Sequence, residues 1–169
     1  LCPGAEFGAA KRWPPNQFAE LATMFLRDNL DVWIVGSPND RIAADAVRNS
    51  LGENVHRVRD LTARTDLGTA IDLLSVAALV VSNDSGLMHA AAAVGVPVLA
   101  LFGSSSPVYT PPLSALAHIA KIDIACSPCF KRECPLGHFR CMRELAPPIV
   151  YNLARAALPA YLSPPQRRS

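Results

Sequence analysis

The amino-acid sequence predicts a doubly wound α/β domain with a parallel sheet. Short apolar segments rich in Val and Leu alternate along the chain with segments whose apolar residues recur at helical spacing. The segments at 78–83 and 97–103 are largely apolar, which is typical of strands that are covered on both faces. Helices packed on each side of a parallel sheet provide that cover, so this is the architecture that we expect.

The expected helices and strands follow one another along the whole chain. Residues 1–2 resemble the end of a strand, and Asn16 is expected to cap a helix over 16–29. Thr65 is expected to cap a later helix over 66–77, and Gly95 to end a helix over 86–95. The remaining expected elements are a helix at 40–50 and strands at 31–36, 54–60, 78–83, 97–103 and 118–122.

Composition excludes several classes of protein. The 169 residues are 50% hydrophobic and 18% charged, which indicates a globular domain rather than a disordered chain. A net charge of +2 is too small to favour a nucleic-acid surface, and neither a membrane-spanning run nor a signal peptide is visible. The five cysteines are more typical of reduced cytoplasmic thiols than of a disulfide framework. Because the chain opens without Met on a partial strand, we expect a single domain, residues 1–169, taken from a longer cytoplasmic protein.

Four loops are expected at the carboxyl edge of the sheet, where ligands bind in this architecture. The loops at 3–13, 36–40, 82–86 and 103–107 combine Gly with small hydroxyl or acidic residues. Gly allows close approach of the backbone to a ligand, N–H groups at helix starts attract phosphate, and Lys11 adds a cation. The pattern indicates nucleotide binding, but it contains neither the dinucleotide fingerprint nor the P-loop, which disfavours a dehydrogenase or an ATPase.

The same residues also have structural interpretations. Asp84 and Ser85 are common helix caps, His89 fits a half-buried position, and Lys11 fits a solvated loop. Only the concentration of polar residues at one edge of the sheet favours a site.

Three motifs carry a resemblance to a known family. The stretches "PGAEFGAAKRWP", "VVSNDSGLMHAAAAVGVPVLALFGSSSP" and "CSPCFKRECPLGHFRCM" resemble the second half of glycosyltransferase family 9, the ADP-heptose:lipopolysaccharide heptosyltransferases. Members have the GT-B architecture, in which two Rossmann-like domains face each other across a cleft. The resemblance implies that this chain is the C-terminal, donor-binding domain, and that the N-terminal domain with the acceptor site and the catalytic base is absent from it.

The resemblance also implies the roles of individual residues. Lys11 matches the lysine that pairs with the donor diphosphate and offsets charge as the sugar–phosphate bond breaks. Asp40 is the nearest match to the acidic residue that binds the ribose. Asp84 suits sugar hydroxyls better than phosphate, because a carboxylate repels a diphosphate. In the family, the turn that holds the diphosphate and the heptose corresponds here to Asp84, Ser85, Gly86, Leu87 and His89.

The implied reaction is transfer of heptose from ADP-heptose to the lipopolysaccharide core with inversion, without a required cofactor or metal. The isolated chain is expected to be inactive, because the base lies in the missing domain. The implied location is the cytoplasm, with peripheral association at the inner membrane. A non-catalytic nucleotide-sugar-binding module and a GT-B-type epimerase stay open as alternatives.

A cysteine-rich segment leaves its own alternatives open. Cys126, Cys129, Cys134 and Cys141 follow the spacing C-x2-C-x4-C-x6-C, with His138 in the last interval. Zinc binds paired cysteines, although usually at wider separation between the pairs, and a thiol-rich or oxidised loop is the alternative. We expect no stoichiometric zinc. The basic residues of this segment would suit an anionic acceptor or a solvated surface; they are Lys131, Arg132, Arg140 and Arg143.

Overall fold

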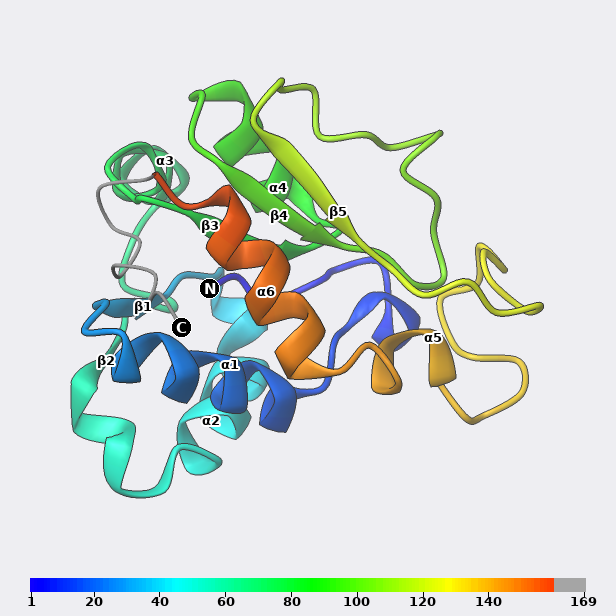
Figure 1. The fold of residues 1–169 in the computed structure, drawn as a ribbon, viewed down its shortest axis with the longest axis horizontal. Helices are drawn as coiled ribbons and strands as arrows, with labels where there is room; N and C mark the ends of the chain where they lie inside the picture. The colour runs from blue at the N-terminus through cyan, green and yellow to red at the C-terminus, as the bar shows by residue number, and fades with distance from the viewer. Residues whose placement is uncertain (160–169) are drawn as a thin grey trace, which may run out of the picture.

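The computed structural model describes residues 1–159 as alternating strands and helices (Figure 1). The strands are β1 (Val32–Ile34), β2 (Val58–Asp60), β3 (Val80–Asn83), β4 (Val98–Leu101) and β5 (Ala117–Ala120). The α-helices are α1 (Pro15–Arg27), α2 (Arg41–Asn49), α3 (Leu67–Ser75), α4 (Gly86–Ala93), α5 (Arg140–Arg143) and α6 (Pro147–Ala157). Three 3-10 turns complete the set: η1 (Ala9–Lys11), η2 (Pro38–Asp40) and η3 (Gly52–Arg57).

Residues 1–2 lie at the centre of the sheet and join its two halves. The carbonyl of Leu1 accepts a hydrogen bond from the N–H of Val35 at 2.9 Å, and the N–H of Cys2 donates to the carbonyl of Val81 at 2.9 Å. On either side, β1 pairs with β2, and β3 with β4 and β4 with β5, all in parallel. The order is therefore β2, β1, residues 1–2, β3, β4, β5, which confirms the predicted parallel sheet and the strand at the start of the chain.

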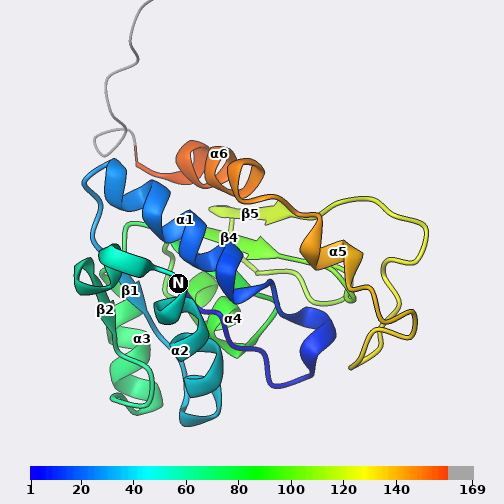
Figure 2. The ribbon, with the colours of Figure 1, turned by 90° about the horizontal axis from the view of Figure 1, so that it is seen from below.

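Helices cover the sheet on both faces, as Figure 2 shows with α1 and α6 side by side on one face and α3 and α4 on the other. Alternate residues of β4 face the two layers. Leu99 and Leu101 pack into the core with α1, α2 and α6, whereas Val98 and Ala100 pack with α3 and α4. The doubly wound architecture is thus as predicted.

Several predicted element boundaries are wrong. Helix α1 begins at Pro15 after Pro14, so Asn16 lies inside the first turn and does not cap it; proline suits the first helical position because its fixed φ is already helical. The cap of α3 is Asp66, whose carboxylate accepts from the N–H of Thr69 at 2.7 Å, rather than Thr65. The strand expected at 54–60 is only β2, because η3 occupies its first half.

The sequence pattern does not predict helix α6, near the end of the described residues, although this helix contributes buried Val150 and Ala154 to the core. None of the helices within residues 1–159 combines the length and the hydrophobicity that a membrane span requires.

Candidate functional site

A cavity of about 870 Å³ lies at the carboxyl ends of residues 1–2 and β3. These neighbouring strands lead to helices on opposite faces of the sheet, α1 and α4, so the cavity lies at the topological switch point. All seven residues singled out from the sequence line it, namely Lys11, Asp40, Asp84, Ser85, Gly86, Leu87 and His89.

Three of the four loops predicted at this edge reach the cavity, and the loop at 103–107 does not. That loop packs instead against the cysteine-rich segment: the carbonyl of Ser104 accepts from the N–H of Phe130 at 2.7 Å, and the carbonyl of Gly103 accepts from Ser127 at 2.7 Å. The start of α3 and Thr110 line the cavity instead. The sequence pattern does not indicate these two segments as parts of the site, because neither carries a glycine-rich turn.

Lys11 and Asp84 form a largely buried ion pair in the cavity wall. The Nζ of Lys11 lies 2.5 Å from Oδ2 of Asp84, and the two side chains are 13% and 4% exposed. The hydroxyl of Thr110 donates to the same carboxylate oxygen at 3.3 Å. The interpretation of Lys11 as a solvated loop lysine is therefore wrong, and the buried charge of each partner is compensated by the other.

Asp84 is not the cap of the helix that follows it. The N-cap position of α4 is Ser85, and no side chain in the described part of the chain accepts a hydrogen bond from the first turn of this helix. Within residues 1–159, the N–H groups of Gly86 and Leu87 have no acceptor, as is usual for the first turn of a helix. Gly86 and Leu87 both line the cavity, and a Cβ at Gly86 would meet no atom within 4 Å outside its own helix turn and chain neighbours. The first turn of α4 therefore offers the cavity unpaired donors at the positive end of a helix.

Asn83 fixes the loop that carries Lys11, a role that the sequence pattern does not indicate. Its buried side chain accepts from the N–H of Trp13 at 3.0 Å and donates to the carbonyl of Pro3 at 2.8 Å. One amide thus holds both ends of the 3–13 loop against the end of β3. The indole of Trp13 is anchored in turn, because its Nε1 donates to the carbonyl of Leu145 at 2.8 Å.

Asp40 lies in the cavity wall but is already engaged by its own turn. Its Oδ2 accepts from the N–H of Ser37 at 2.8 Å and from the hydroxyl of Ser37 at 2.9 Å, closing a capping box around η2. The Oδ1 atom packs against Gly4, where a Cβ would come within 1.9 Å of it, so only glycine allows this approach. The ribose-binding role of Asp40 stays a prediction.

His89 lines the cavity one turn into α4, and it is exposed rather than half-buried. Its backbone N–H donates to the carbonyl of Ser85 at 3.4 Å. The imidazole is therefore accessible from the cavity.

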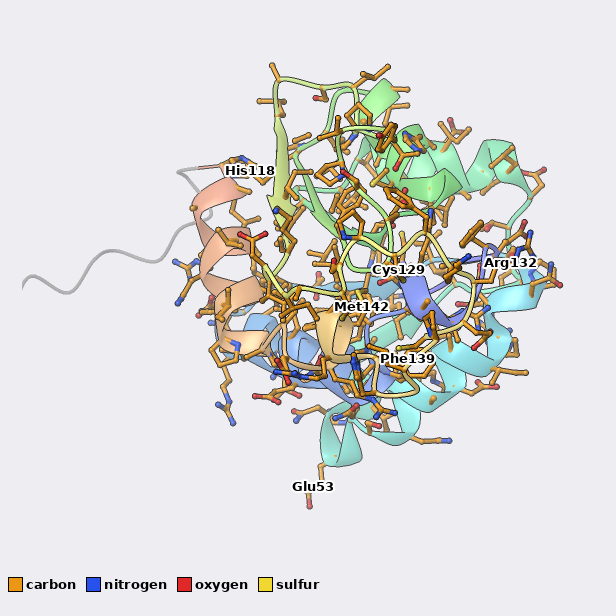
Figure 3. The ribbon with its side chains drawn as sticks, turned by 90° about the vertical axis from the view of Figure 1, so that its right-hand side faces the viewer. Glu53, His118, Cys129, Arg132, Phe139 and Met142 are labelled. Carbon is orange, nitrogen blue, oxygen red and sulfur yellow. The ribbon has the colours of Figure 1, made fainter. Side chains whose placement is uncertain are left out.

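The cysteine-rich segment is not among the residues that line this cavity; it lies at the end of the molecule that faces the viewer in Figure 3. Lys131, Arg132, Arg140 and Arg143 are all exposed there. No group of three or more His, Cys, Asp or Glu residues in the described part of the chain lies so as to hold a metal ion. The expected absence of zinc stays a prediction.

Comparison with known proteins gives consistent matches. The family model for glycosyltransferase family 9 (heptosyltransferase) matches residues 1–140. The chain is 42% identical over 151 residues to lipooligosaccharide heptosyltransferase 2 of Haemophilus ducreyi, covering 87% of this chain and 43% of that protein. It is 37% identical over 159 residues to lipopolysaccharide heptosyltransferase 2 of Escherichia coli, covering 94% and 46%.

A solved structure agrees with these matches. The structure of E. coli ADP-heptose lps heptosyltransferase II superposes with a TM-score of 0.82 at 36% identity, covering 92% of this chain and 44% of that chain. This chain therefore spans less than half the length of the relatives named here.

Proposed function

Because this chain belongs to glycosyltransferase family 9, the heptosyltransferase family, we propose that it is the donor-binding domain of an enzyme that transfers heptose from ADP-heptose to the lipopolysaccharide core. The two relatives named above are heptosyltransferases of lipooligosaccharide and lipopolysaccharide. The observation that carries the proposal is the position of the Lys11–Asp84 pair beside the first turn of α4, in the switch-point cavity.

The diphosphate of the donor would bind between Lys11 and the first turn of α4. The Nζ of Lys11 supplies a cation, and the N–H groups of Gly86 and Leu87 supply unpaired donors at the positive end of the helix. Negative charge grows on the departing ADP as the sugar–phosphate bond breaks. Groups aimed at that charge stabilise the transition state more than the ground state, so Lys11 assists departure as well as binding.

Asp84 would bind the heptose. Its Oδ2 is occupied by Lys11 and Thr110, whereas Oδ1 makes no hydrogen bond within residues 1–159. A carboxylate oxygen accepts hydrogen bonds only, which suits a sugar hydroxyl, and the neighbouring lysine offsets its repulsion of the diphosphate.

The nucleoside would extend from the diphosphate toward η2 and the start of α3. Asp40, Ser37 and Leu67 line that part of the cavity. The Oδ1 atom of Asp40 is the acceptor that we propose for a ribose hydroxyl, since Oδ2 is held by Ser37.

The catalytic base and most of the acceptor site would belong to an N-terminal domain, which is the partner of residues 1–169 in a GT-B enzyme. The acceptor hydroxyl, deprotonated by that base, would displace ADP in line and invert the anomeric carbon. We propose that transfer needs no bound metal, because Lys11 and the helix start take up the charge of the leaving group. The enzyme would act in the cytoplasm at the inner face of the membrane, with the exposed basic residues near Arg132 turned to the anionic acceptor.

The test is a transfer assay with the longer enzyme, ADP-heptose and a lipopolysaccharide core acceptor. We expect ADP release matched by heptose on the acceptor. Conversion of ADP-heptose to an epimer without transfer, or tight binding without turnover, would instead support the epimerase or the non-catalytic module.

A further inference from the structure

A second, smaller cavity gathers the cysteines of the chain outside the donor site. Its volume is about 160 Å³, and the four cysteines between 126 and 141 all line it, together with His138. All four are free thiols, with Cys141 buried and the other three half-buried. The cavity therefore places several thiols around one small space that an oxidant can reach.

Cys134 differs from its neighbours in its surroundings. Its sulfur accepts a hydrogen bond from the N–H of Phe139 at 3.4 Å, and Nδ1 of His138 lies 4.0 Å from it. The backbone N–H groups that follow it, above all that of Phe139, lower the pKa of the Cys134 thiol. Burial is the largest cause that raises the pKa of the Cys141 thiol, and the neighbouring thiols raise it further. The cluster thus combines one thiol whose pKa is lowered with another whose pKa is raised.

We propose that Cys134 is a redox-active thiol that a hydroperoxide oxidises and that then forms a disulfide with another cysteine of the same cavity. The thiolate of Cys134 attacks the peroxide O–O bond, which gives a sulfenic acid and releases hydroxide (or alkoxide). A second thiol attacks the sulfenic sulfur, the S–S bond forms, and water leaves. A dithiol reductant then reduces this disulfide by thiol–disulfide exchange; it becomes a disulfide itself and both cysteines return to free thiols.

The loop that carries these cysteines is in direct contact with the loop that carries Lys11. The carbonyl of Arg132 accepts from the N–H of Ala10 at 2.9 Å, and Ala10 itself lines the cysteine cavity. Gly8 packs so closely on Arg132 that a Cβ there would lie 2.3 Å from its carbonyl oxygen. The ring of Phe7 contacts two cations: its centroid lies 4.8 Å from Nζ of Lys11 and 5.1 Å from the guanidinium carbon of Arg132.

Because Arg132 lies two residues before Cys134, we expect a disulfide to Cys134 to move the segment on which the Lys11 loop rests. We expect oxidation to weaken the binding of a nucleoside diphosphate at the switch-point cavity. This consequence rests on the proposed function, whereas the oxidation of Cys134 does not.

The first experiment treats the purified chain with hydrogen peroxide, alkylates the remaining thiols with iodoacetamide and maps the peptides by mass spectrometry. We expect loss of free Cys134 and a peptide that links it to Cys126, Cys129 or Cys141, both reversed by dithiothreitol. Cys2 is the control, because its buried thiol has a pKa raised by desolvation. Cys134 that stays free while Cys2 or another thiol reacts, or a tightly bound metal ion that protects all four thiols, would overturn the proposal.

The second experiment measures ADP binding by calorimetry before and after peroxide, in the wild type and in Cys134→Ser. We expect a several-fold rise in Kd for the oxidised wild type and no change for the variant. An oxidised wild type with an unchanged Kd would overturn the coupling. Absence of ADP binding by the reduced chain would count against the proposed function alone, and peptide mapping of the wild type tests the thiol chemistry even where the variant does not fold.

Discussion

The ammonium of Lys11 and the carboxylate of Asp84 lie 2.5 Å apart although 73 residues separate them in the chain. Lys11 comes from the loop that follows residues 1–2 at the centre of the sheet, and Asp84 comes from the loop after β3. Their contact joins the two loops that meet at the switch point of the sheet, so we expect a substitution of either residue to affect both the site and the stability of the fold.

Replacement of Lys11 by Ala should weaken ADP binding by about 1.5–3 kcal/mol, the usual contribution of a hydrogen bond to a charged group. Calorimetry at low salt measures the change, with Lys131→Ala as the matched control, since Lys131 is an exposed lysine outside the cavity. A Kd equal to that of the wild type would contradict the assignment of Lys11 to the diphosphate.

Asp84→Asn should impair heptose transfer by the longer enzyme far more than it impairs binding of plain ADP. The amide keeps the shape of the carboxylate but loses its charge and half of its accepting capacity. Plain ADP carries no heptose, so its binding does not depend on a hydrogen bond from the sugar to Asp84. Rates of transfer and the Kd for ADP give the comparison. Transfer at the wild-type rate together with a lower melting temperature would show that the pair with Lys11 is only structural.

Gly86→Val should reduce both ADP binding and transfer. Gly86 lines the cavity where the diphosphate is proposed to bind, so a branched side chain there would take up part of that space. Because a Cβ at Gly86 would meet no atom within 4 Å outside its own helix turn and chain neighbours, the melting temperature should change much less than the Kd. Normal ADP binding by this variant would place the diphosphate elsewhere.

Asn83→Ala should lower the free energy of unfolding by about 1–3 kcal/mol, because it leaves the N–H of Trp13 and the carbonyl of Pro3 buried without partners. Urea unfolding measures this loss. Asn152→Ala serves as the control, since Asn152 is exposed on α6. Equal stability of the two variants would show that Asn83 does not hold the loop.

The purified chain should contain no stoichiometric zinc. Thiols that are free to react with peroxide cannot at the same time be closed ligands of a structural metal. Elemental analysis settles the content, and one zinc per chain that is lost together with stability on chelation would contradict this expectation.

The sequence predicted the members of the site better than their contacts. All seven expected residues line one cavity, because the carboxyl ends of parallel strands meet at the same edge of a sheet whatever the details of the loops. The bonds of Asn83 join residues 70 or more positions apart, and no periodicity or spacing reveals such a partner. The cap of α1 was misplaced for a local reason, since Pro14, Pro15 and Asn16 all suit a helix start and the packing of the helix decides between them.

The loop at 103–107 shows the limit of reasoning from strand ends alone. It has the glycine and hydroxyl composition of a ligand loop, and it does follow a strand at the carboxyl edge. Its position beside the cysteine-rich segment depends on contacts with Ser127 and Phe130, which come from a part of the chain without regular structure before α5.

Calorimetric titration of the chain with ADP, UDP and GDP tests the central proposal most directly. We expect ADP to bind at a single site, more tightly than UDP or GDP, and Lys11→Ala to weaken that binding. Equal affinity for the three nucleotides, or ADP binding that does not depend on Lys11, would contradict the account of this cavity as the ADP-heptose site.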